Sequence, residues 1–214
     1  MAYPITGIDV SAYQPKIDWA KVRDGGHRFA YLKATEAEGY VSPTFKAQWN
    51  GALGAGLVVG AYHFAQPDAD ATDDADRFVD EVGDFGRGHL SPVLDIETAN
   101  GLGPVALVNW CQMWVERVES LTSVWPVIYT GPNFWRWHLL PAGERAQRLT
   151  SWRLWQAQYA RSLTPMRDAP NWKPLIWQWT GSGACPGIKG KVDLNRFLGT
   201  EAEFRQLAAL EPDP

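Results

Sequence analysis

Two carboxylic acids end the apolar run from Pro92 to Thr98, where Asp95 and Glu97 are separated by a single residue. If this run is a β-strand, residues two apart lie on one face, about 6.5–7 Å apart along the chain. Repulsion between neighbouring carboxylates and burial both raise a carboxyl pKa, so one group can stay protonated near neutral pH. A carboxylic acid beside a carboxylate can cleave a glycosidic bond, and such a cluster could also hold Mg²⁺ or Mn²⁺.

The composition indicates a globular domain with a sizeable core. Of the 214 residues, 45% are hydrophobic, and the net charge is −4. This charge argues against nucleic acid as a partner, because phosphate binding needs a clustered basic surface. The sequence has no apolar stretch of about 18 residues that could insert into a membrane. Twelve Trp residues are an unusually large number, and we expect about half of them in the core. Since indole rings stack on sugar rings, the others fit a carbohydrate ligand.

The cysteine and histidine residues do not indicate a metal or redox site. Cys111 falls in a helical stripe and Cys185 in a Gly- and Pro-rich loop, and the sequence leaves open whether they pair. The four His residues lack zinc-site spacing, so we expect neither a metal nor a cofactor. A signal peptide has a basic segment followed by a long apolar segment, and the N-terminus at Met1 to Ile5 shows neither. We therefore expect either synthesis in the cytoplasm or a leader that has been removed.

Strand and helix patterns alternate along the chain. Strands are predicted at 5–11, 29–35, 57–64, 92–98, 125–131, 154–159, 175–180 and 192–194. Helices are predicted at 18–22 with Asp18 as the cap, at 42–53, around 75–82, at 104–121 and at 201–210, before a polar tail. The longest helix has an apolar stripe made of Leu107, Cys111, Trp114, Val118 and Leu121.

Five strand–helix units followed by three strands with little helix predict an α/β barrel that is parallel for most of its circuit. A complete (β/α)8 barrel needs about 250 residues, so a TIM-like barrel that lacks its late helices fits this chain better. We expect residues 1–214 to form a single catalytic domain with its core at about 5–210. No separate cell-wall-binding domain is predicted, and a monomer is expected.

Polar residues recur where the predicted strands end, and a barrel would gather them on one rim. Each has an ordinary alternative, because a lone Asp at a strand end is usually a cap and a lone Tyr usually belongs to the core. The convergence of acids from distant strands is harder to explain as solvated surface. These residues are Asp9, Glu36, Tyr62, His63, Asp95, Glu97, Tyr129, Gln178, Trp179 and Asp193.

Seven stretches in a fixed order resemble the glycoside hydrolase family 25 lysozymes, the Chalaropsis-type N-acetylmuramidases. They are residues 7–15 (GIDVSAYQP), 31–36 (YLKATE), 60–64 (GAYHF), 94–97 (LDIE), 125–130 (WPVIYT), 177–179 (WQW) and 192–195 (VDLN). Each stretch alone is weak evidence, but the combination is specific. Small departures, such as Ala37 after the second stretch, do not touch a proposed catalytic group.

The resemblance implies an irregular (β/α)5β3 barrel that cleaves the β-1,4 bond between N-acetylmuramic acid and N-acetylglucosamine in peptidoglycan glycan strands. It implies that Glu97 is the general acid. Three further acids match the active site: Asp95, Asp9 and Asp193. Tyr62 and Tyr129 match sugar-contacting tyrosines. The matching stretches also make Gln178, Trp179, Glu36 and Phe64 candidate substrate contacts.

Two mechanisms remain open for the second half of the reaction. Asp95 could orient the 2-acetamido group of the substrate, which attacks the anomeric carbon with retention of configuration, and this is the route we favour. Alternatively, one of Asp9, Asp95 and Asp193 could activate water with inversion, for which carboxyl groups stand about 6.5–9.5 Å apart. Rival functions are a chitinase-like hydrolase, a catalytically inactive carbohydrate-binding barrel and a metal-dependent enzyme. A phage endolysin, released from the host cytoplasm to the cell wall, and a secreted lysozyme are the two biological settings considered.

Overall fold

The computed structural model describes residues 5–67, 70–86 and 88–208 of the chain. The strands are β1 (Thr6–Val10), β2 (His27–Glu36), β3 (Tyr40–Val41), β4 (Val58–Phe64), β5 (Val93–Asp95), β6 (Val127–Thr130), β7 (Arg153–Ala157), β8 (Pro174–Gly183) and β9 (Val192–Phe197). The helices are α1 (Trp19–Asp24), α2 (Phe45–Gly54), α3 (Ala71–Val82), α4 (Pro104–Thr122), α5 (Pro132–Phe134), α6 (Glu144–Leu149) and α7 (Glu201–Leu207). Between α5 and α6 lie the π-helical segment η1 (Trp135–Leu139) and the 3-10 segment η2 (Leu140–Ala142).

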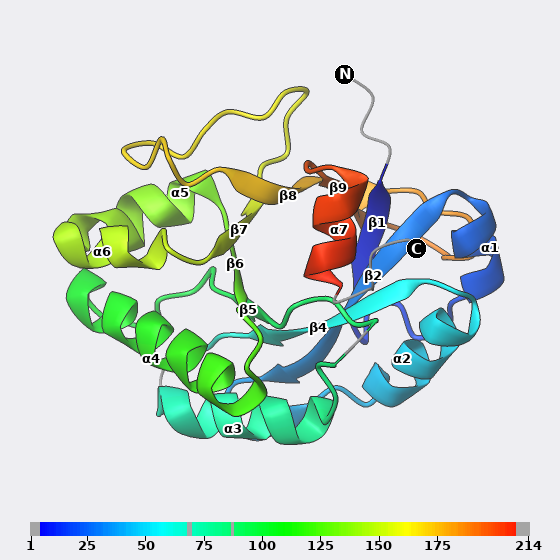
Figure 1. The fold of residues 1–214 in the computed structure, drawn as a ribbon, viewed down its shortest axis with the longest axis horizontal. Coiled ribbons are helices and arrows are strands. Elements are labelled where there is room, and N and C mark those ends of the chain that lie inside the picture. The colour runs from blue at the N-terminus through cyan, green and yellow to red at the C-terminus, as the bar shows by residue number, and fades with distance from the viewer. Residues whose placement is uncertain (1–4, 68–69, 87, 209–214) are drawn as a thin grey trace.

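Eight of the strands close into a barrel, in the order β1, β2, β4, β5, β6, β7, β8, β9, and β9 pairs back to β1. All neighbours are parallel except β9, which runs antiparallel to both β8 and β1. The two-residue strand β3 extends the sheet beside the end of β2. Five strand–helix units and three final strands confirm the predicted irregular barrel (Figure 1).

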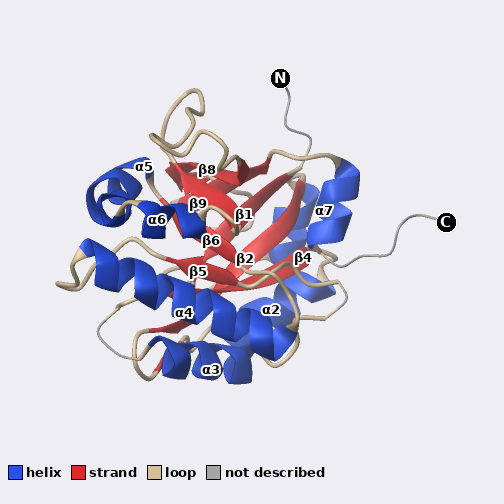
Figure 2. Ribbon diagram, turned by 60° about the vertical axis from the view of Figure 1, so that its left-hand side comes forward, coloured by secondary structure: helices blue, strands red, loops and turns tan. Residues whose placement is uncertain are grey.

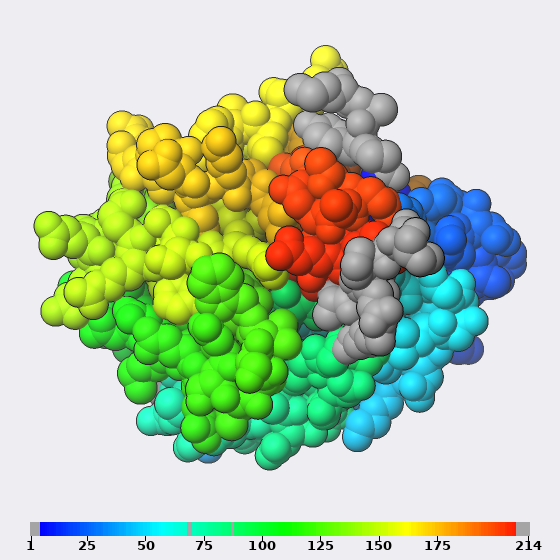
Figure 3. Space-filling model, viewed as in Figure 1, coloured from blue at the N-terminus to red at the C-terminus, as the bar shows by residue number. Residues whose placement is uncertain are grey.

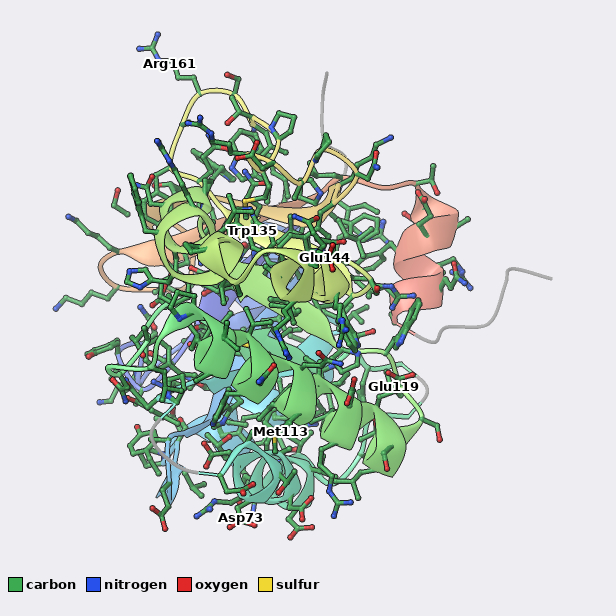
Figure 4. The ribbon with its side chains drawn as sticks, turned by 90° about the vertical axis from the view of Figure 1, so that its left-hand side faces the viewer. Asp73, Met113, Glu119, Trp135, Glu144 and Arg161 are labelled. Carbon is green, nitrogen blue, oxygen red and sulfur yellow. The ribbon has the colours of Figure 1, made fainter. Side chains whose placement is uncertain are left out.

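The helices lie outside the ring of strands, with α3 and α4 side by side (Figure 2). The fifth helical unit is divided into α5, η1, η2 and α6, which explains why the helical pattern fades after residue 131 of the sequence. Pro132, Pro141 and Gly143 interrupt it, and the buried residues Trp135 and Leu149 come from different pieces. Figure 4 shows these pieces stacked above α4 and α3, with Arg161 at the tip of the loop before β8.

The core has two parts, one inside the barrel and one between the barrel and the helices. Inside, the aromatic rings of Phe29 and Tyr31 fill the space where β1 and β4 carry Gly7 and Gly60, since a Cβ at either glycine would overlap one of these rings. Helix α7 closes the amino-terminal end of the parallel strands with Phe204 and Leu207. In the space-filling view its atoms cover much of the middle of this face (Figure 3).

Most of the Trp residues belong to the core, a larger share than the half that we predicted. The buried ones are Trp19, Trp110, Trp114, Trp135, Trp152, Trp155, Trp172 and Trp177. In helix α4 the predicted stripe is buried except for Leu121, which lies in the last turn and is 43% exposed. Both Cys111 and Cys185 are buried free thiols.

The predicted boundaries agree with the structure to within a few residues, with one exception that matters for the site. The run 92–98 was predicted as a single strand, but β5 ends at Asp95 and Glu97 follows it in a loop. The predicted end of the last helix at 209–210, the polar tail and residues 1–4 lie outside the described residues. None of the helices in the described part of the chain is long and apolar enough to cross a membrane.

Candidate active site

Inward-facing side chains at the carboxyl ends of the parallel strands form the candidate site. Side chains alternate along a strand, so β1 points Asp9 inward, β5 points Asp95 and β6 points Tyr129. Strand β9 runs the opposite way, and its first residues therefore meet the same end of the barrel. In this way Asp193 lies at the same end of the barrel as Asp9, which is far from it in the sequence.

Asp9 and Asp193 are direct partners in the pairing of β1 with β9. Side chains at such a position share one face, with Cβ atoms about 4.5–5.5 Å apart. Burial and the neighbouring charge of Asp193 raise the pKa of Asp9 to about 8, although hydrogen bonds from Asn195 and Gln178 act in the opposite direction. Burial also raises the pKa of Asp193. At neutral pH Asp9 therefore keeps its proton, beside the second acid of the pair.

The carboxylate of Asp9 accepts hydrogen bonds from two buried amides. The Nε2 atom of Gln178 lies 3.0 Å from Oδ2 and 3.2 Å from Oδ1, and Nδ2 of Asn195 lies 2.6 Å from Oδ2. Gln178 was predicted as a substrate contact. The structure places it beneath the rim. There its Oε1 atom accepts hydrogen bonds from the hydroxyl groups of Tyr129 and Tyr159, each with an O–O distance of 2.9 Å.

Asp95 and Glu97 lie at different depths. Asp95 is buried and lines a small cavity of about 10 Å³ together with Asp9, Tyr62 and Tyr129, and its Oδ1 atom has no hydrogen-bond partner among the described residues. Glu97 is exposed in a groove of about 440 Å³ above. The sequence predicts both acids on one face of a strand, but β5 ends at Asp95, and Glu97 faces solvent from the loop that follows.

The pKa values of both acids are raised. For Asp95 the main cause is burial, followed by the charges of Glu97 and Asp9, and the pKa lies well above its usual range. For Glu97 the causes are partial burial of the carboxyl group and the charge of Asp193. The nearby ammonium group of Lys33 lowers the pKa of both acids. Lys33 therefore opposes the trend set by the carboxylates.

Lys33 connects the acids with two predicted substrate contacts. Its ammonium group forms an ion pair with Glu36 and lies 4.4 Å from the ring centroid of Phe64. The other oxygen of Glu36 accepts a hydrogen bond from Gln66 at 3.4 Å. Glu36 and Phe64 thus surround the cation that lies beside the acids.

The groove has an aromatic wall. Its lining residues are Glu97, Tyr129, Gly131, Pro132, Asn133, Phe134, Ala157, Gln158 and Tyr159. Burial and nearby carboxylates raise the pKa of Tyr129 well above 10 and that of Tyr159 to about 12, so both hydroxyl groups stay protonated and can donate. Gly181 leaves room here, since a Cβ at this position would lie 2.9 Å from the Tyr159 hydroxyl and 3.0 Å from Asp193 Oδ1.

Two rim residues named from the sequence have other neighbours. The contacts of Trp179 are with Arg196, whose guanidinium lies 4.7 Å from the ring centroid, and with the hydrophobic layer outside the barrel. His63 points outward into the layer beneath α3 and α4. There Thr35 Oγ1 lies 2.8 Å from Nδ1, and Asp74 Oδ2 lies 3.6 Å from Nε2. The structure therefore does not bring these two residues to the acids.

Three residues of the site were not singled out from the sequence. Tyr159 lies just after β7, a strand-end position like the others, and that position was the available signal. Asn195 shares a strand face with Asp193, two residues before it, and Lys33 occurs within the matching stretch 31–36. Among the described residues, no group of three or more His, Cys, Asp and Glu side chains is arranged to hold a metal ion.

An exposed carboxylic acid in a groove at the strand ends of a barrel, with buried carboxyl partners below it, is the arrangement of a glycoside hydrolase. The comparison with known families agrees with this class. The chain belongs to the glycosyl hydrolases family 25, whose model matches residues 8–188.

Relatives of known sequence and structure support this membership. The chain is 38% identical over 209 residues to an Escherichia coli O157:H7 protein named "Uncharacterized protein YegX", covering 95% of this chain and 73% of that one. It is 33% identical over 219 residues to Lysozyme M1 of Streptomyces globisporus, covering 95% and 71%. The crystal structure of a bacterial lysozyme from Streptomyces coelicolor superposes with a TM-score of 0.89 at 31% identity, covering 98% of this chain and 99% of the other.

Proposed function

We propose that the protein is an N-acetylmuramidase that hydrolyses the β-1,4 bond between N-acetylmuramic acid and N-acetylglucosamine in peptidoglycan. The observation that carries this proposal is the position of Glu97, the acid that reaches into the groove while Asp95, Asp9 and Asp193 lie below or beside it. The name of the Streptomyces globisporus relative, a lysozyme, supports the same activity.

Glu97 is the general acid that protonates the leaving glycosidic oxygen. In the free protein the deeper burial of Asp95 favours a proton on Asp95. Sugar in the groove removes water from Glu97 and so raises its pKa further. An amide N–H that donates to Asp95 favours the charged form of that acid. Substrate binding therefore moves the proton of the pair to Glu97, the position from which it can be donated.

Asp95, once ionised, orients the 2-acetamido group of the muramic acid and stabilises the positive charge that develops on it. The carbonyl oxygen of that group attacks the anomeric carbon as the glycosidic bond breaks, and water then opens the cyclic intermediate. Anomeric configuration is retained and the enzyme forms no covalent bond to the sugar. In the inverting alternative, a carboxylate activates water for direct attack. NMR analysis of the first product distinguishes them, because retention gives the β-anomer and inversion gives the α-anomer.

The activity is tested by mass spectrometry of peptidoglycan digests. A muramidase releases fragments with muramic acid at the reducing end, whereas reducing-end glucosamine would refute the assignment. We expect Glu97→Gln to lose at least about 100-fold in rate, as general acid catalysis contributes about 10²–10⁴. The matched control is Glu119→Gln, a surface position on α4, which keeps wild-type activity. An active Glu97→Gln variant would contradict the acid role.

The same assay addresses the rival functions. A chitinase-like enzyme would release reducing ends from polymers of N-acetylglucosamine faster than from peptidoglycan. An inactive binding barrel would retain the glycan strands in a pull-down and release none. A metal-dependent enzyme would lose activity in EDTA and recover it with Mg²⁺ or Mn²⁺. We expect release from peptidoglycan that EDTA does not change.

A further inference from the structure

The side-chain amides of Gln178 and Asn195 lie beneath the acids and are almost fully buried, at 3% and 1% exposure. They come from neighbouring strands, where they are direct partners in the antiparallel register of β8 and β9. Both direct their NH2 groups at Asp9, and together they contact both of its carboxylate oxygens. Their function is therefore linked to Asp9 and not to direct contact with sugar in the groove.

Aromatic donors fix the orientation of each amide from the opposite side. The indole N–H of Trp155, which can only donate, lies 2.9 Å from Oδ1 of Asn195. The hydroxyl groups of Tyr129 and Tyr159 each lie 2.9 Å from Oε1 of Gln178. Each amide must present its oxygen to these donors, so its NH2 group can only face Asp9. A flipped amide would lose its bonds on both sides, and burial makes an unpaired polar atom costly.

We propose that Gln178 and Asn195 are positioning residues, which hold Asp9 as a fixed acceptor and leave its remaining hydrogen-bonding capacity to Asp193. The proposal rests on the proposed function in one respect: the Asp9–Asp193 pair matters for catalysis only if Glu97 is the general acid. Asp193, the partner of Asp9, is also the acid whose charge raises the pKa of Glu97.

The network also connects the groove with the buried pair. Tyr159 is 64% exposed and lines the groove, yet its hydroxyl group ends a chain that runs through Gln178 to Asp9. Hydrogen bonds from the two amides stabilise the ionised form of Asp9 against burial and against the charge of Asp193. Loss of either amide donor, or of the group that orients it, must therefore make Asp9 harder to ionise.

The test is a carboxyl ¹³C NMR titration of Asp9 in the full-length protein, with the signal assigned by its loss in Asp9→Asn. We expect a wild-type midpoint near the value of about 8 given above. Gln178→Met removes one donor to Asp9, and Trp155→Phe removes the N–H that orients Asn195. Each should raise the midpoint by about one pH unit. The matched control is Trp172→Phe, which also removes a buried indole hydrogen bond, to Trp152 O at 2.8 Å, but in the outer core.

Equal midpoints in Gln178→Met, Trp155→Phe and the Trp172→Phe control would overturn the proposal, as would a fall in the midpoint. Should the two buried variants fail to fold, Tyr159→Phe provides the test at an exposed position. It removes one of the two hydroxyl donors to Gln178, so we expect a smaller rise in the midpoint, and an unchanged midpoint would contradict the network. The titration needs no catalysis. Its result is therefore independent of the muramidase assay. The proposed function alone is refuted if wild-type protein releases no reducing-end muramic acid.

Discussion

Asp9 and Asp193 are direct partners in the pairing of the first and last strands of the barrel, β1 and β9, and their side chains share one face. The pairing is sensitive to register, because a shift of one residue would turn Asp193 to the outer face of β9 and bring Leu194 inward. The neighbouring pairs Ile8 with Leu194 and Gly7 with Asn195 prevent such a shift, since Leu194 packs outside the barrel. Hydrophobic packing outside the barrel thus determines which acids lie opposite each other inside it.

The first prediction concerns the charge of Asp193. This charge raises the pKa of Glu97, so Asp193→Asn should lower that pKa, and Glu97 should lose its proton at lower pH. The basic limb of kcat/KM then moves down by about one pH unit, which corresponds to about a tenfold loss of activity on that limb. Asp168→Asn, which changes an exposed acid beside Arg167, is the control and should leave the profile in place. A basic limb that stays or moves up would contradict this account.

Lys33 should have the opposite effect. Its positive charge lowers the pKa of both Asp95 and Glu97, and Lys33→Met removes the charge while keeping an unbranched side chain over Phe64. We expect the basic limb of kcat/KM to move up by about one pH unit. Lys46→Met, at a surface ion pair with Glu81, is the matched control. In the double variant with Asp193→Asn the two shifts should largely cancel, and shifts in the same direction would refute the electrostatic explanation.

A third prediction concerns stability. The pKa of Asp9 is about 8 in the folded chain and near 3.9 in an unfolded one. Between these values the folded state binds more protons, so the free energy of unfolding falls as pH rises from about 4 to about 8. Asp9→Asn removes this dependence. Relative to wild type, the variant should therefore gain stability with rising pH, by a few kcal/mol at most between about pH 5 and pH 8.

Urea unfolding at several pH values measures this difference, and the comparison with wild type cancels the contribution of His63. Burial lowers the pKa of that histidine, so its effect on stability runs the other way, with a loss as pH falls. Asp76→Asn is a suitable control because the ion pair with Arg117 lowers the pKa of Asp76, and its own pH dependence lies below this range. Parallel curves for wild type and Asp9→Asn would show that Asp9 ionises normally.

The fourth prediction tests the packing beneath the site. A methyl group at Gly60 would overlap the ring of Tyr31 and also contact Leu90, so Gly60→Ala should cost about 1–3 kcal/mol by overpacking. At the end of α2, Gly54 has nothing within 4 Å of the same position, and Gly54→Ala should be neutral or stabilising by up to about 1 kcal/mol. Chemical denaturation of the two variants measures the contrast. Equal effects would mean that the barrel interior can adjust around Tyr31.

The architecture could be predicted because its signals are local. Apolar strands followed by amphipathic helices, such as α4 with its buried stripe, indicate an α/β barrel without knowledge of distant contacts. The position of acids at strand ends follows from the same alternation, and Asp9, Asp95 and Asp193 do converge. The capping position of Asp18 was also readable, since its side chain accepts from Lys21 N.

The remaining features depend on long-range packing. Periodicity assigns Asp95 and Glu97 to one face, but it contains no information on where the strand ends or which acid lies deeper. A Gln at a strand end can contact sugar or another side chain, and only the positions of Tyr129, Tyr159 and Asp9 determine which. Trp179 illustrates the converse. Its stacking partner Arg196 comes from a strand that the sequence pattern could not orient.

The antiparallel strand β9 has a consequence for folding during synthesis. Asp193 and Asn195 belong to the last barrel strand in chain order, and their partner Asp9 belongs to the first. Until β9 has been synthesised, β1 can pair only with β2, and the circle of strands stays open. A chain still growing on the ribosome can form the early strand–helix units, but it has no complete set of acids. Such non-local closure is slow relative to local folding. The chemistry of the site therefore begins only after translation has passed its final strand.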